Sequence, residues 1–301
     1  MMKERHTRGV ITALVTPFTQ DGEVDEAGWI SNLQTQIQAG VHGVVVLGTT
    51  GEAPTVSALE RRRLIQLARE ILPPFCPLWV GTGCASTQGS IALCQEAEAL
   101  GADGLLVVVP YYNRPNQRGL LTHFQKVASS TRLPLYLYNV PKRTGTSLEV
   151  ETIVELSYTP SIAGLKDASG SLSDMQAVIE KVRPHRPDFA LLCGDDILTF
   201  PFLALGGDGI VSVISNLLPQ EMVRLVAACF KGEWDAGREA HYQLLPILRA
   251  LGVDTNPIPI KAAMEMCRMA AGPCRLPLTP FAPQHAKALQ QQLSQYTHAF
   301  S

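Results

Sequence analysis

The chain has 301 residues, of which 46% are hydrophobic and 17% charged, and its formal net charge is −2 at pH 7. This composition is typical of a folded protein with a large core, and the lack of a basic excess argues against a nucleic-acid partner. The longest apolar runs are too short to span a bilayer, and the basic first ten residues lead into no signal-peptide core. We therefore expect a cytoplasmic protein with no membrane partner.

Eight short segments rich in Val, Ile and Leu recur along the chain at similar spacing. Each is almost uninterrupted, which is typical of parallel strands buried on both faces. Eight strands alternating with helices predict an α/β fold, specifically a (β/α)8 TIM barrel. A doubly wound open sheet is the alternative, because a count of strands does not show closure. The segments lie at residues 9–18, 43–52, 76–83, 104–113, 133–141, 161–169, 189–196 and 209–216.

The stretches between these segments show helical periodicity. Residues 57–72 place apolar side chains on one side of a helix and charged ones on the other, the apolar set being Leu59, Leu64, Leu67 and Ile71. A second helix is expected after Ser86, a good N-cap, and before Gly101. Further helices are expected at 172–182 and 199–207.

After the eighth segment the pattern contains only helices, at residues 219–251, 258–272 and 283–300. No low-complexity stretch or flexible linker separates them from the preceding part. We expect a barrel that carries the active site over residues 1–218 and a helical extension, packed on the barrel, over residues 219–301.

Cysteine and histidine patterns favour neither a metal site nor a cofactor. The seven cysteines form no CxxC pair, so we expect reduced thiols packed as small hydrophobic groups. The glycine-rich stretch GTGCASTQG lacks both the P-loop lysine and the dinucleotide-binding spacing. The histidines stand in no triad or zinc pattern.

Polar residues follow the expected strands, and in barrel enzymes the chemistry takes place at the carboxyl ends of the strands. The sharpest candidate is Lys166, which ends an apolar segment. Burial there would favour the neutral amine, which can attack a carbonyl carbon and form a Schiff base. A lysine that reaches solvent from the barrel rim, or that pairs with Asp167, would give the same pattern.

Other candidates stand at the ends of neighbouring strands. The hydroxyls of Thr49 and Thr50 suit a small carboxylate, although threonines also cap ordinary turns. The hydroxyls of Tyr112 and Tyr138 could shuttle a proton, although tyrosines are also common packing residues. Arg143 could bind a carboxylate with two hydrogen bonds or be a solvated surface charge. The pair Asp195–Asp196 is better explained as a helix N-cap than as an acid/base pair.

Taken in order, the motifs GTTGE, PYYNRP, YNVPKRTG, GLKDASG, GDD and NPIP resemble the dihydrodipicolinate synthase family, a branch of the N-acetylneuraminate lyase superfamily of class I pyruvate aldolases. The resemblance covers nearly the whole chain. It implies a lyase that condenses pyruvate with L-aspartate 4-semialdehyde through a lysine Schiff base, without cofactor or metal. That reaction is the first committed step toward diaminopimelate and lysine.

The resemblance also assigns catalytic roles. Lys166 would form the Schiff base with pyruvate, and Tyr138 would pass protons beside the imine. Thr49 would connect Tyr138 to Tyr112, which in this family reaches into the site of a neighbouring subunit. The resemblance therefore implies self-association, as a homotetramer built as a dimer of dimers.

Three further residues would bind the substrates. Thr50 would hold the pyruvate carboxylate, and Arg143 would receive the carboxylate of the semialdehyde. Val211 would contribute its backbone carbonyl near the pyruvate site.

The sequence departs from the family at a regulatory pocket. Members inhibited by lysine carry Asn and Glu where this chain has Ala85 and Gly89, and many carry His where it has Ala58, whereas Tyr111 is retained. Without an amide acceptor and a carboxylate to pair with the ammonium of free lysine, we expect weak inhibition by L-lysine or none.

Two alternatives remain at this stage. N-acetylneuraminate lyases and 2-keto-3-deoxy sugar-acid aldolases share the lysine and the tyrosine, so Lys166 does not separate them. A non-catalytic keto-acid-binding barrel is the other, because a fold alone does not establish activity.

Overall fold

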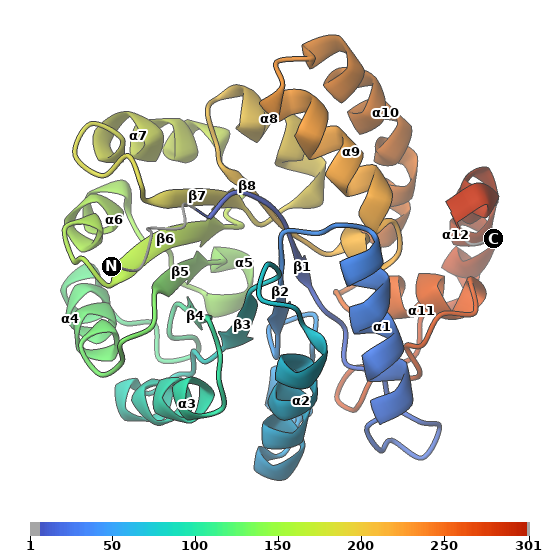
Figure 1. The fold of residues 1–301 in the computed structure, drawn as a ribbon, viewed down its shortest axis with the longest axis horizontal. Helices are drawn as coiled ribbons and strands as arrows, with labels where there is room; N and C mark the ends of the chain where they lie inside the picture. The colour runs from blue at the N-terminus through green and yellow to red at the C-terminus, as the bar shows by residue number, and fades with distance from the viewer. Residues whose placement is uncertain (1–6, 300–301) are drawn as a thin grey trace.

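The computed structural model describes residues 7–299, and its centre is a closed barrel of eight parallel strands (Figure 1). The strands follow one another around the barrel in chain order, and the pairing of β8 with β1 closes it. The predicted (β/α)8 barrel is confirmed, and this closure excludes the open sheet. The strands are β1 (Gly9–Ala13), β2 (Gly43–Val46), β3 (Leu78–Gly81), β4 (Gly104–Val108), β5 (Leu135–Asn139), β6 (Ile162–Asp167), β7 (Ala190–Cys193) and β8 (Gly209–Ser212).

Helices surround the barrel and continue beyond it. Those between strands are α1 (Glu26–Gln38), α2 (Ala58–Ile71), α3 (Thr87–Ala99), α4 (Gln117–Ala128), α5 (Pro141–Thr144), α6 (Val150–Ser157), α7 (Leu172–Val182) and α8 (Thr199–Ala204). After β8 come α9 (Pro219–Phe230), α10 (Trp234–Leu251), α11 (Ile258–Met266) and α12 (Pro283–Leu293). Short 3-10 turns are η1 (Ala53–Thr55), η2 (Asp196–Leu198), η3 (Ile214–Asn216) and η4 (Ser294–Ala299).

The helices predicted from periodicity are present, with two corrections. The stretch 219–251 is two helices, because the chain turns at Gly232, which has a φ of +76°. In α2 the expected apolar position Leu59 is wrong, since its side chain is 77% exposed. At 3.6 residues per turn Leu59 lies about half a turn from the centre of the buried face. That face is formed by Leu64, Ile65, Leu67 and Ala68.

The strand side chains form two apolar layers, as expected for a barrel buried on both faces. An inner layer fills the barrel and includes Val45, Leu106, Tyr138 and Val211. An outer layer packs between the strands and the helices. The candidate residues stand at or beyond the carboxyl ends of these strands.

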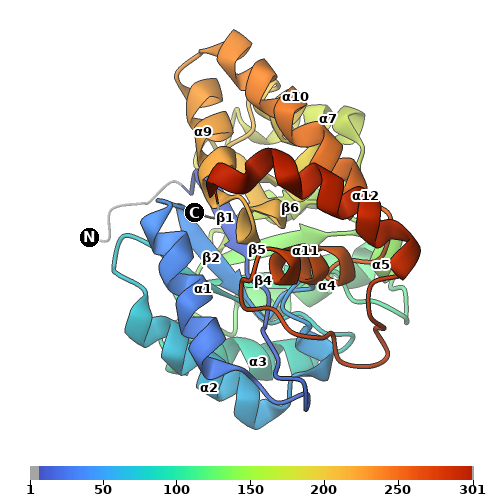
Figure 2. The same ribbon diagram turned by 90° about the vertical axis from the view of Figure 1, so that its right-hand side faces the viewer.

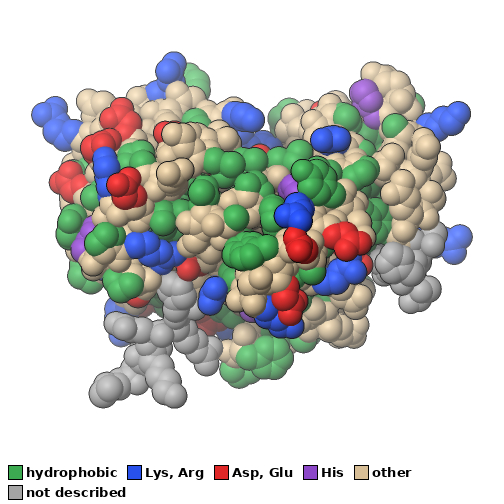
Figure 3. Space-filling view, turned by 90° about the horizontal axis from the view of Figure 1, so that it is seen from above, with side chains coloured by type: hydrophobic (Ala, Val, Ile, Leu, Met, Phe, Trp, Pro, Cys, Tyr) green, Lys and Arg blue, Asp and Glu red, His purple; other side chains and the backbone are tan. Residues whose placement is uncertain are grey.

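The helices after β8 pack on the barrel and on one another. Helix α9 lies against β1, α8 and α10, while α12 contacts α10 and α11 at the edge of the molecule (Figures 1 and 2). Helix α11 reaches back to η3, just beyond the end of β8. None of the helices described is both long and apolar enough to cross a membrane. On the face in Figure 3, acidic and basic side chains are interspersed.

Candidate active site

One irregularity in β6 decides which way Lys166 faces. Ile162, the first residue of β6, packs in the outer layer, and the register with β5 skips one residue at Ala163. Because side chains alternate along a strand, a regular strand would place Lys166 on the same outer face as Ile162. The extra residue reverses the alternation, so that Lys166 aligns with Tyr138 of the inner layer.

The Lys166 amine lies against the ring of Tyr138 inside the end of the barrel. Its Nζ is 4.1 Å from the centroid of that ring, and the side chain is 5% exposed. Gly194 leaves the room that this side chain occupies, because a Cβ at Gly194 would lie 3.1 Å from the lysine Cε. The predicted burial of Lys166 at the end of its strand is confirmed, and a lysine that reaches solvent from the barrel rim is excluded.

The neighbouring carboxylate, Asp167, is held by other partners. Asn139 Nδ2 donates to it at 2.8 Å, and the Ser169 hydroxyl donates at 2.6 Å. Within residues 7–299 Lys166 forms no ion pair with Asp167, which removes that alternative. Burial raises the pKa of Asp167 above its usual value. The Asn139–Asp167 hydrogen bond joins the ends of β5 and β6 and so fixes Tyr138 beside Lys166.

A cavity of about 400 Å³ opens at the carboxyl end of the strands. Thr49, Tyr138 and Arg143 line it, so the structure brings together three of the residues predicted from the sequence. Asn256 also lines it and connects two predicted substrate-binding residues: its side-chain amide donates to Thr50 Oγ1 at 3.0 Å, and its carbonyl accepts from Arg143 Nη2 at 3.0 Å.

Asn256 is a site residue that reasoning from the sequence missed. Its motif, NPIP, was part of the family resemblance but had no assigned role. It lies 206 residues from Thr50 along the chain, so spacing gave no signal. Gly194, also missed, stands in the GDD motif that drew attention for its carboxylates.

Val211 lies in β8 and belongs to the inner layer. Asp195 caps η2 by accepting from a backbone N–H, which confirms the predicted N-cap. Asp196 has a different role: its side chain is half-buried, and desolvation raises its pKa. It holds the turn after β8 by accepting hydrogen bonds from Ser212 Oγ at 2.6 Å, Val213 N at 2.9 Å and Ile214 N at 3.0 Å.

Tyr112 is the predicted site residue that does not lie with the others. Its side chain is 93% exposed, and its φ of +72° is unusual for a residue with a side chain. Within residues 7–299 no hydrogen bond joins Thr49 to Tyr138 or to Tyr112. The predicted proton relay therefore remains a prediction.

The predicted regulatory region lies beside this cavity, which Cys84 and Tyr111 also line. A Cβ at Gly89 would lie 2.6 Å from Cys84 Sγ, so the thiol occupies the space beside this glycine. The carbonyl of Ala85 accepts a hydrogen bond from Asn113 Nδ2 at 2.8 Å. Burial raises the pKa of Tyr111.

The cysteines are free thiols, and Cys76, Cys94, Cys193 and Cys229 are buried, as predicted. Burial raises the pKa of Cys76 and of Cys94 to about 11, which keeps both protonated at neutral pH. In the part of the chain that the structure describes, no three His, Cys, Asp or Glu side chains are arranged to hold a metal ion.

Comparison with known proteins identifies the family. The model of the dihydrodipicolinate synthetase family matches residues 6–296. The chain belongs to this family. A family member from Protochlamydia amoebophila, 4-hydroxy-tetrahydrodipicolinate synthase, is 44% identical over 290 residues, which cover 96% of this chain and 97% of that protein.

Solved structures of family members have the same fold. Dihydrodipicolinate synthase from Thermotoga maritima is 39% identical, with a TM-score of 0.95 over 97% of this chain and 99% of that one. The chloride-inhibited family member from Acinetobacter baumannii, solved in complex with pyruvate, is 36% identical, with a TM-score of 0.92 over 95% and 98% of the two chains.

Proposed function

We propose that this protein is a lyase that condenses pyruvate with L-aspartate 4-semialdehyde to form 4-hydroxy-tetrahydrodipicolinate, the first committed step toward diaminopimelate and lysine. The observation that carries the proposal is the buried Lys166 amine against Tyr138, at the end of the barrel where Thr49 and Arg143 line a cavity. The family of the chain supports the same reaction.

The chemistry begins at the Lys166 amine. As a neutral amine, Nζ attacks the C2 carbonyl of pyruvate, and loss of water gives an imine. The imine nitrogen withdraws electrons, so the pyruvate methyl group loses a proton and becomes an enamine carbon nucleophile. This carbon attacks the aldehyde of the semialdehyde, and the amine of the product closes the ring as it displaces Lys166.

The surrounding residues position the substrates and move protons. Tyr138, beside Lys166, would donate and accept protons at the imine, with Thr49 connecting it to the rest of the relay. Thr50 would bind the pyruvate carboxylate and Arg143 the carboxylate of the semialdehyde. The Val211 backbone carbonyl would face the pyruvate site. No step requires a metal ion or an organic cofactor.

We also propose that the active form is a homotetramer, a dimer of dimers, in which Tyr112 completes the site of a neighbouring subunit. The exposure of Tyr112 and its absence from the cavity of its own chain support this arrangement. Sedimentation with an activity measurement on each species tests it, and an active monomer would contradict it. Free thiols at all seven cysteines support a reducing, cytoplasmic location, which fractionation would test.

The decisive experiment tests both the turnover of the two substrates and the identity of the nucleophile. The protein is assayed with pyruvate and L-aspartate 4-semialdehyde, coupled to dihydrodipicolinate reductase and followed as loss of NADPH. Borohydride reduction in the presence of pyruvate, followed by peptide mass spectrometry, locates the imine. We expect turnover and an adduct on Lys166, both lost in Lys166→Ala. Lys181→Ala, at an exposed lysine paired with Glu151, is the matched control and should retain both.

The outcomes separate the alternatives. Turnover of sialic acid or a keto-deoxy sugar acid, without condensation of the semialdehyde, would assign the chain to another aldolase branch. Absence of both turnover and adduct in the wild type would favour a keto-acid-binding protein.

A further inference from the structure

The turn that carries Thr49 and Thr50 is bounded by two residues in an unfavourable backbone conformation. Leu47, before the turn, has a φ of +56°, and Glu52, after it, has a φ of +53°. Neither is glycine, so both side chains crowd the backbone in this left-handed region. Such conformations persist where the surrounding structure holds them, and they concentrate at functional sites.

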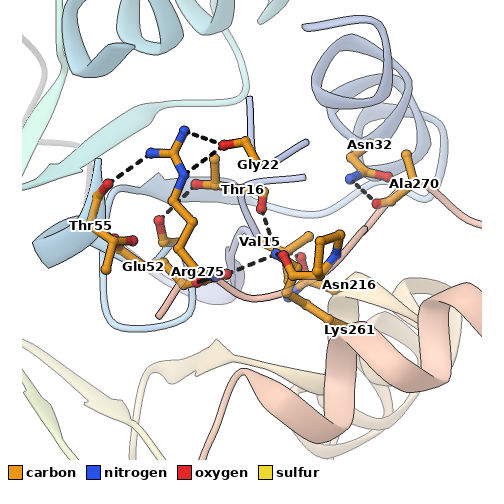
Figure 4. A network of polar contacts seen from close by, with 12 residues as sticks. Val15, Thr16, Gly22, Asn32, Glu52, Thr55, Asn216, Lys261, Ala270 and Arg275 are labelled. Atoms are coloured by element: carbon orange, nitrogen blue, oxygen red, sulfur yellow. Dashed lines mark hydrogen bonds and ion pairs between the residues drawn. The ribbon is translucent and has the colours of Figure 1, made fainter. Parts of the chain in front are cut away.

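The side chain of Glu52 is held by the segment that follows α10. Its Oε1 lies 2.8 Å from Lys261 Nζ, and its Oε2 accepts from the Arg275 backbone N–H at 2.9 Å (Figure 4). Lys261 Nζ also donates to the Thr16 carbonyl at 3.1 Å and to the Pro273 carbonyl at 2.8 Å. The Glu52 and Lys261 side chains are almost completely buried. The ammonium therefore links the turn to the loop that follows β1 and to the C-terminal segment.

A third contact to the turn comes from Thr16, in the loop that follows β1. Thr16 Oγ1 donates to the Gly51 carbonyl at 2.7 Å. A Cβ at Gly51 would lie 3.0 Å from the Leu47 nitrogen, so this glycine is required by close packing within the turn. The turn is thus packed tightly against Thr16, whose backbone carbonyl accepts a hydrogen bond from Lys261.

The same C-terminal segment contacts the turn again at Thr50. Asn256 Nδ2 donates to Thr50 Oγ1 at 3.0 Å. A threonine hydroxyl has one proton, and an acceptor contact to Asn256 leaves that proton for donation elsewhere. The contact therefore leaves the Thr50 proton available for the pyruvate carboxylate that the proposed function assigns to it.

We propose that residues 256–275 form a clamp that holds the Thr49–Thr50 turn in the geometry that binds the pyruvate carboxylate, with Lys261 and Asn256 as positioning residues. The inference rests on the proposed function, because it assigns the turn to pyruvate. Two separate contacts from one segment converge on this turn, at Thr50 and at Glu52. A buried ion pair that served stability alone would need neither the second contact at Thr50 nor the left-handed backbone at Glu52.

The test compares two substitutions in one network. Glu52→Gln removes the charge that Lys261 binds at the turn. Glu60→Gln removes a carboxylate at the far end of the network, where Glu60 binds the Arg275 guanidinium at 2.5 Å. Both replace a buried or half-buried glutamate by its neutral isostere, but only Glu52 belongs to the turn. Glu60→Gln is therefore the matched control: it removes an ion pair, with the accompanying loss of stability, without changing the turn.

Two readouts are measured on the full-length wild type and both variants. The first is the pyruvate concentration that gives half-maximal borohydride trapping on Lys166, with KM for pyruvate and kcat from the coupled assay. The second is amide hydrogen exchange in peptides that span residues 47–53. We expect Glu52→Gln to raise half-saturation and KM by about fivefold, since a charge-assisted hydrogen bond is replaced by a weaker neutral one, and to speed exchange in the turn. Glu60→Gln should change neither.

The outcomes separate the clamp from the proposed function. Normal trapping in the wild type, with the two variants equal in half-saturation and in exchange, would overturn the clamp alone. No trapping in the wild type would overturn the proposed function, and the exchange comparison would still decide whether Glu52 holds the turn. If Glu52→Gln fails to fold, Asn256→Ala replaces it, because that half-buried side chain has no buried charge partner. It should likewise raise KM for pyruvate, and an unchanged KM would contradict the clamp.

Discussion

Replacing Lys261 by methionine should destabilise the protein by about 3–5 kcal/mol, the usual cost of leaving a buried charge without its partner. The Glu52 and Lys261 side chains are 1% and 2% exposed, so water cannot replace the lost ion pair. Methionine keeps the apolar stem but removes the donor to the Glu52 carboxylate and to the carbonyls of Thr16 and Pro273. The Arg275 N–H then remains as a donor to that carboxylate.

The double variant Lys261→Met with Glu52→Gln isolates the charge. Both variants leave the carbonyls of Thr16 and Pro273 without their lysine donor, at about 1–3 kcal/mol each, but only the double variant also removes the buried carboxylate. The double variant should therefore be about 2 kcal/mol more stable than Lys261→Met alone. The measurement is urea unfolding by circular dichroism at one fixed protein concentration, since assembly also affects apparent stability. The reasoning is refuted if Lys261→Met lies within about 1 kcal/mol of wild type, or if the double variant is no more stable than the single.

Three further predictions concern pH, packing and regulation. The Arg275 guanidinium lowers the pKa of Glu60 from 4.5 to about 2, so the stability from this pair is full above pH 4.5 and is lost as the pH falls toward 2. The melting temperature of Glu60→Gln should fall less than that of wild type over this range, and equal falls would contradict the assignment. Gly81→Ala should lower stability by about 2 kcal/mol or more, because its Cβ would overlap the Leu47 carbonyl beneath the turn, whereas a Cβ at Gly48 has only ordinary contacts. Denaturation of Gly81→Ala and Gly48→Ala side by side checks this, and equal losses would show that the overlap is relieved. L-lysine should inhibit turnover weakly or not at all, since Gly89 lacks a carboxylate for its ammonium, and strong inhibition at sub-millimolar lysine would overturn this prediction.

The strands and most helices were predictable because uninterrupted apolar runs and helical periodicity are local patterns of the sequence. The break between α9 and α10 was missed, although Gly232 marks it, because apolar side chains continue on both sides of it. Leu59 was misplaced because an apolar residue near a helix start was counted without its angle around the helix.

The candidate site was predictable in part for a similar reason. The carboxyl ends of parallel strands meet at one end of a barrel, so polar residues after separate strands come together. Thr49, Tyr138 and Arg143 follow this rule. Asn256 does not, because it reaches the site from a segment after the last strand, and only folding brings it to Thr50.

The sequence by itself determined eight buried strands alternating with helices and a lysine at the end of the sixth, whereas the pairing of β8 with β1 showed that they close into a barrel. It did not determine the direction in which that lysine faces. A regular alternation from Ile162 turns Lys166 outward, and the extra residue at Ala163 turns it inward to Tyr138. The register of a strand is set by pairing with its neighbours, which here are distant in sequence, so the tertiary structure alone decided that the amine lies inside the barrel.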